Sequence, residues 1–165
     1  MKTPGKSAVA ALAAMAMTGQ SLAADICARP EEAMALKAAA VQQELMVAAL
    51  TCGDIQPYNQ FVLSHRRELQ ESDAALLSYF QRAASREAGM ANYNAYKTGL
   101  ANNFSLASLR RRDAFCYTAE TAFAESGRPL AMFVSDQQVA SGDFSTCSSG
   151  DSDMVAGGSS ALRGE

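Results

Sequence analysis

Histidine is almost absent from this chain, which carries a single one, His65, in 165 residues. Any acid–base or nucleophilic mechanism that depends on imidazole would have to use this residue. Ser64 precedes it, but adjacent residues of a helix do not face each other, so the two do not form a catalytic pair. Because His65 falls on the apolar stripe of a predicted helix, we interpret it as a half-buried, hydrogen-bonded residue, with a pH-responsive role as the alternative.

Motifs that hold metals, haem or phosphate are also missing. The four cysteines are widely spaced and none belongs to a Cys-x-x-Cys pair, which argues against a zinc site, a thioredoxin-type redox centre and covalently attached haem. There is no glycine-rich phosphate loop and no Gly-x-Ser-x-Gly elbow, and the methionines are scattered. We therefore predict no metal and no cofactor.

Long apolar runs and a strong charge bias are lacking as well. No segment after residue 24 approaches about 20 uninterrupted apolar residues, so the sequence predicts no transmembrane span. The formal net charge is -3, which gives no reason to expect nucleic acid or an anionic membrane as a partner. The oligomeric state is left open.

The N-terminal segment has the composition of an export signal. Lys2 and Lys6 precede an apolar run over residues 7–17, and small side chains fill positions 21–24. Such an Ala-rich leader is typical of short exported bacterial proteins, and cleavage after Ala24 would release a chain that begins at Asp25. We expect a periplasmic or secreted protein, in which an even number of cysteines forms disulfides.

Apolar residues recur at helical spacing in four regions, which are 30–52, 57–83, 91–102 and 105–125. Ser72-Asp73 is an alternative break within the second region, and Asn102-Asn103 either separates the last two or lies inside one continuous helix. Gly89 is expected to close the second region, and Gly127 to stop the last. The fold class is therefore all-α, a bundle of about four mostly antiparallel helices.

Composition divides the chain into three parts. Residues 1–24 form the signal peptide, and residues 25–147 form the helical domain. Residues 148–165 are rich in Gly and Ser and have few large apolar side chains, so this tail cannot offset its ordering entropy and is predicted to be disordered.

The length of the first predicted helix restricts how the cysteines pair. A helix over 31–51 would separate Cys27 from Cys52 by about 30 Å, far more than the roughly 7 Å that a disulfide tolerates. Two connectivities remain, and in an up-down bundle we favour the nested pairs Cys27–Cys147 and Cys52–Cys116. The alternative joins Cys27 to Cys116 and Cys52 to Cys147.

Two sets of residues are candidates for binding. The aromatic set, expected to line a pocket between helices, is Tyr58, Phe61, Tyr93 and Tyr96. The basic set is Arg110 and Arg111, which with Arg112 are suited to a phosphate, an acidic glycan or a carboxylate-rich partner. Three consecutive arginines spread over about 200° of a helix, however, so a solvated, salt-bridged face is the competing interpretation.

We expect a non-enzymatic interaction protein of the cell envelope, with no catalytic residues, because no catalytic signature is present. The first alternative is a small-ligand carrier that uses the aromatic set. The second is an envelope hydrolase with a pair of carboxylates, although nothing in the sequence distinguishes any two of them.

Overall fold

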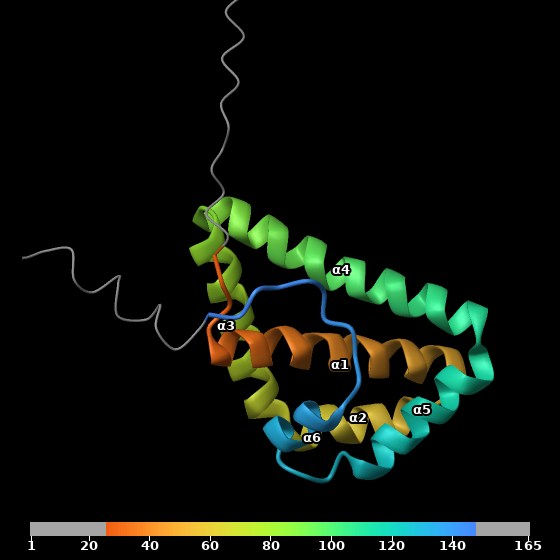
Figure 1. The fold of residues 1–165 in the computed structure, drawn as a ribbon. Helices are drawn as coiled ribbons and strands as arrows, with labels where there is room; N and C mark the ends of the chain where they lie inside the picture. The colour runs from red at the N-terminus through yellow and green to blue at the C-terminus, as the bar shows by residue number, and fades with distance from the viewer. Residues whose placement is uncertain (1–25, 148–165) are drawn as a thin grey trace, which may run out of the picture.

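The computed structural model describes residues 26–147, which form an all-α domain without a strand in that range (Figure 1). The predicted signal peptide and the predicted tail lie outside the described residues. The helices are α1 (Pro30–Cys52), α2 (Ile55–Ser64), α3 (Arg66–Ala83), α4 (Arg86–Arg110), α5 (Arg112–Glu125) and α6 (Leu130–Asp136). The described domain thus has six helices, where the sequence pattern predicts about four.

α1 has the predicted bounds, and its ends have local causes. Pro30 occupies the first turn, where its missing N–H costs nothing, and the Arg29 N–H donates to the Glu32 carboxylate at 2.8 Å. Gly53 ends the helix with φ 93°, a left-handed conformation that favours glycine. α1 runs through the middle of the domain, with α4 on one side and α2, α5 and α6 on the other (Figure 1).

The remaining helices differ from the predicted ones in where they break. The second region divides at His65, between α2 and α3, and not at Ser72-Asp73. α4 runs without interruption through Asn102-Asn103 and ends at Arg110, and the apolar segment around Phe133 forms α6. These breaks and the short α6 raise the number of helices to six.

Gly89 does not close a helix, contrary to the prediction, and instead lies in the first turns of α4 against α3. A Cβ atom there would lie 2.5 Å from Gln81 Cα and 2.7 Å from the Phe80 carbonyl oxygen. The absence of a side chain therefore allows the two helix backbones to touch.

The hydrophobic core has two parts, and α1 contributes to both. One part, between α1 and the α2, α5 and α6 side, contains Val41, Leu45, Phe61 and Phe133. The other, between α1 and the α3–α4 pair, contains Leu36, Leu76, Tyr79, Phe80 and Leu100. By length and composition α1 is also long and apolar enough to cross a membrane, and most of its apolar stretch is buried against the other helices.

The disulfides are the nested pairs favoured by the sequence argument. Cys27 and Cys147 have Cα atoms 4.8 Å apart, and Cys52 and Cys116 have Cα atoms 5.7 Å apart. Beside the first disulfide, the Ala28 N–H donates to the Ser145 carbonyl at 2.7 Å, so the two ends of the described domain are joined by backbone as well. The second disulfide ties the end of α1 to α5.

Candidate functional site

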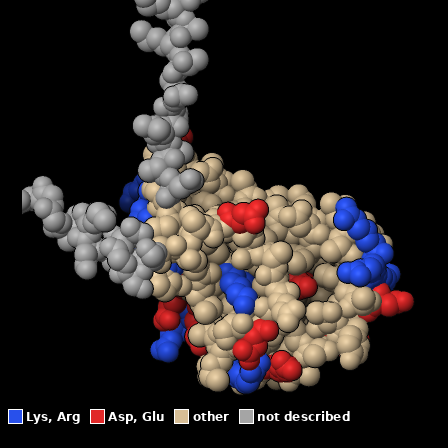
Figure 2. Space-filling view, in the orientation of Figure 1, with Lys and Arg blue, Asp and Glu red and all other residues tan. Residues whose placement is uncertain are grey.

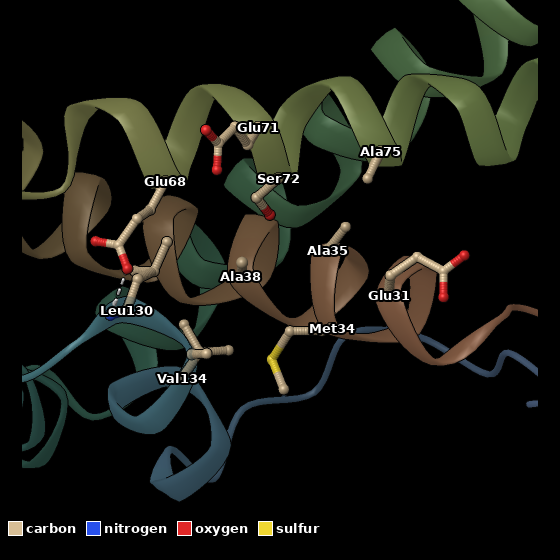
Figure 3. A pocket seen from close by; sticks show the side chains of 11 residues that line it. Glu31, Met34, Ala35, Ala38, Glu68, Glu71, Ser72, Ala75, Leu130 and Val134 are labelled. Atoms are coloured by element: carbon tan, nitrogen blue, oxygen red, sulfur yellow. Dashed lines mark hydrogen bonds between the residues drawn. The ribbon is translucent and has the colours of Figure 1, made fainter.

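A groove of about 320 Å³ lies between α1, α3 and α6 (Figure 3). Its floor is apolar, because small side chains of α1 and α3 leave space that α6 does not fill. The apolar lining residues are Met34, Ala35, Ala38, Ala75, Leu130, Ala131 and Val134. Glu68 and Glu71 stand on α3 near one end, and Glu31 stands on α1 near the other.

The groove has acidic groups at its rim and no Lys or Arg among its lining residues. Glu31 is exposed and forms no ion pair within the described residues. Glu71 pairs with Arg67 at 3.6 Å, but both side chains are exposed, and such pairs contribute little. The residues that line the groove therefore carry acidic groups only.

One wall of the groove is fixed by the single histidine. His65 is 5% exposed, and its Nε2 lies 2.7 Å from the Ser126 carbonyl oxygen, which accepts only. Its Nδ1 lies 3.0 Å from one oxygen of Glu68, whose other oxygen accepts from the Leu130 N–H at 3.2 Å. The histidine is thus hydrogen-bonded, as predicted, but it is fully buried where the sequence predicts a half-buried residue. It links α3 to the loop before α6.

Glu68 is accordingly a structural carboxylate. The hydrogen bond from His65, together with the Leu130 N–H, lowers the pKa of Glu68 from its ordinary value, although partial burial acts in the opposite direction. Both of its oxygens have partners, so it remains ionised and holds α6 in place.

The four aromatic candidates do not come together around one cavity. Phe61 is 2% exposed and packs against Phe133, with ring centroids 5.6 Å apart, and Tyr58 borders the same part of the core. Tyr93 and Tyr96 belong to the other part of the core. None of the four lines the α1–α3–α6 groove.

The hydroxyl groups of Tyr93 and Tyr96 have partners inside the protein. Tyr93 donates to Asp73 at 2.7 Å, and Tyr96 lies within hydrogen-bond distance of two carbonyl oxygens, those of Leu36 at 3.0 Å and Ser141 at 2.7 Å. Burial raises the pKa of Tyr96 well above its ordinary value. Its hydroxyl therefore stays protonated and joins α4 to α1 and to the C-terminal segment.

The structure brings Arg110 and Arg111 together at the corner between α4 and α5, where basic side chains gather at one end of the molecule (Figure 2). Both line a cavity of about 420 Å³. Arg112 points elsewhere, because its guanidinium donates to the Thr51 carbonyl oxygen at the end of α1. The divergence expected of three consecutive arginines is thus observed for the third one.

The same cavity contains Glu44 of α1, which the sequence reasoning missed. Burial raises the pKa of its carboxyl group, and no neighbouring cation offsets that effect. The sequence does distinguish Glu44, because it and Lys37 are the only charged residues of α1 after its first turn.

Within residues 26–147, no three His, Cys, Asp or Glu side chains are grouped so as to hold a metal ion. The chain matches no protein-family model, no curated protein and no solved structure.

Proposed function

We propose that this is an exported, non-enzymatic binding protein of the cell envelope, and that its α1–α3–α6 groove holds a segment of a partner protein. The segment we propose carries one or two apolar side chains flanked by Lys or Arg. The observation that carries the proposal is the apolar floor of the groove, rimmed by Glu31, Glu68 and Glu71 with no basic residue among its lining.

Size and charge both favour this occupant. About 320 Å³ accommodates a few side chains of a larger partner, near the lower limit for sites that enclose a small molecule. Burying apolar side chains on the floor provides affinity, and the exposed carboxylates select a basic segment and disfavour an acidic one.

The two residues best suited to acid–base chemistry are already engaged, which supports a binding role. Both ring nitrogens of His65 and both oxygens of Glu68 have partners inside the domain. Two disulfides keep the scaffold rigid, as suits a protein that works outside the cytoplasm. A hydrolase would need a free carboxylate pair, and a carrier would need a more enclosed pocket.

The test places a photo-crosslinking amino acid at Ala131, which is exposed on the groove wall, in cells of the native host. A second protein carries it at Ser105, an exposed position of α4 outside the groove. We expect the Ala131 position to capture a discrete partner segment that contains an apolar residue next to Lys or Arg.

A synthetic peptide of that segment is then titrated against charge-reversal variants. Glu31→Lys together with Glu71→Lys should weaken binding at least tenfold, while Glu120→Lys, an exposed residue of α5, should leave it unchanged. Capture of the same proteins from both positions, or of acidic segments at Ala131, would contradict the proposal. So would peptide binding that is indifferent to the groove charges.

A further inference from the structure

The corner cavity between α4 and α5 combines charges of both signs. Arg110 and Arg111 line it from the end of α4, and Glu44 lines it from α1. We infer that this cavity is a second binding site, for a small zwitterion whose carboxylate lies against the two arginines and whose ammonium group lies against Glu44. It is separate from the α1–α3–α6 groove, with which it shares no lining residue.

The anionic end of the ligand has several donors at one place. Arg110 and Arg111 are both exposed, and neither forms an ion pair within the described residues, so their guanidinium groups are available for a carboxylate. α5 begins at Arg112, beside the cavity that Ala114 lines. The first N–H groups of this 14-residue helix have no partner within the helix, and Asp113 in the first turn offsets part of the positive potential that they add.

The cationic end of the ligand would satisfy Glu44. This carboxyl group on α1 is partly buried, and neither arginine across the cavity pairs with it. A carboxylate removed from water without a partner is unfavourable, and an ammonium group in the cavity would provide one. A simple anion would instead meet the negative charge of Glu44, so the cavity favours a molecule with both charges.

Two bonds beside the cavity join α1 to α5, which follows directly on the arginines. The Cys52–Cys116 disulfide joins α1 to α5, and the Arg112 guanidinium donates to the Thr51 carbonyl beside it. The backbone segments on either side of the cavity are therefore held in place before any ligand arrives, which reduces the entropic cost of binding.

The experiment titrates the disulfide-bonded protein with three peptides and follows backbone amide resonances by NMR. The peptides are Ala-Ala, N-acetyl-Ala-Ala, which lacks the ammonium group, and Ala-Ala amide, which lacks the carboxylate. We expect Ala-Ala to shift the resonances of Ala107, Ala114 and Gln138, and each blocked peptide to bind at least tenfold more weakly. Glucuronate, an anion with hydroxyl donors and no ammonium group, should also bind more weakly.

Protein variants assign the two ends of the ligand. Glu44→Gln should weaken Ala-Ala at least tenfold without weakening N-acetyl-Ala-Ala, and Arg110→Ala with Arg111→Ala should weaken both. Arg86→Ala is the matched control, because it removes an exposed arginine at the opposite end of α4. All four substitutions, in three variant proteins, remove side chains without partners in the domain, so the thermal unfolding midpoint should not fall.

Three outcomes would overturn the inference. Absence of binding by Ala-Ala would exclude a zwitterion site. Equal binding of N-acetyl-Ala-Ala or of glucuronate would show that the ammonium group is not recognised. Unchanged Ala-Ala binding by Glu44→Gln or by the double arginine variant would remove these residues from the site.

Discussion

The contact between α3 and α4 at Gly89 permits a sharp test of the packing. A Cβ atom at this position would lie 2.5 Å from Gln81 Cα, 2.7 Å from Gln81 N and 2.7 Å from the Phe80 carbonyl oxygen. Carbon atoms prefer a separation of about 3.5–4.0 Å, so Gly89→Ala requires the two helices to part by about 1 Å. All three atoms belong to the backbone, and no side-chain rotation relieves the clash.

The size of the effect follows from two opposing contributions. Alanine in place of glycine inside a helix stabilises by about 1 kcal/mol, whereas overpacking costs about 1–3 kcal/mol. The cost should lie at the upper end of that range, because moving α3 also disturbs the buried residues Leu76, Tyr79 and Phe80. We expect Gly89→Ala to lower the free energy of unfolding by about 1–2 kcal/mol.

Gly99 provides a matched control in the same helix. It also lies within α4, but a Cβ atom there would meet no atom within 4 Å. Gly99→Ala should therefore raise the free energy of unfolding by about 0.5–1 kcal/mol, and the difference between the two variants isolates the clash. Urea unfolding of both proteins with their disulfides intact measures this difference, which should shift the midpoint by about 1 M. Equal stabilisation by both substitutions would refute the close approach of α3 and α4.

Three other predictions concern a buried ion pair, the histidine and the C-terminal tail. Burial by itself raises the pKa of Glu32, but hydrogen bonds from Arg82 and from the Arg29 N–H keep that pKa below its ordinary value. Arg82→Ala should lower the free energy of unfolding by about 3 kcal/mol at pH 7. The loss should be smaller in acid, where the unpaired carboxyl group becomes neutral. Urea unfolding at pH 7 and pH 4 checks this, and a cost that does not change with pH would contradict it. His65→Leu removes the hydrogen bond that lowers the pKa of Glu68, so carbon-13 NMR should show this carboxyl group titrating nearer its ordinary value. In the native protein, Glu68 contributes stability at neutral pH that is lost as the pH falls through its lowered pKa. This contribution should be smaller in the variant. Deleting residues 148–165 should change the free energy of unfolding by less than about 0.5 kcal/mol, and a marked drop in the thermal midpoint would show that the tail has a structural role.

The parts of the fold that local chemistry determines could be predicted from sequence. Pro30, the acidic first turn and Gly53 predict the bounds of α1, and the length of that helix then excludes a bond between its flanking cysteines. The helix breaks at His65 and Arg111 could not be predicted in this way, because neither position carries a proline or a glycine. Long-range hydrogen bonds lie at both breaks, from His65 to Ser126 and from Arg112, next to Arg111, to Thr51.

The candidate sites were predictable to a smaller extent. Arg110 and Arg111 are recognisable in the sequence as part of a basic run. Glu44 becomes a candidate only because it lines the cavity that α4 and α5 form beside it. The α1–α3–α6 groove depends on how three helices, distant in sequence, leave small side chains facing each other. Gly89 shows the same difficulty, because the sequence does not distinguish a glycine that ends a helix from one that allows two helices to pack closely.

The nested connectivity of the disulfides has a consequence for how the domain matures. Cys52 and Cys116 are 64 residues apart, whereas Cys147, the partner of Cys27, follows it by 120 residues. On a chain that emerges N-terminus first, the inner bond can therefore close while the last segment is still in transit. The outer bond closes only when that segment arrives, so its formation reports that the whole domain has been delivered. For the export that we propose, pulse-labelled chains sampled during translocation should therefore accumulate a one-disulfide form in which Cys27 is still a free thiol.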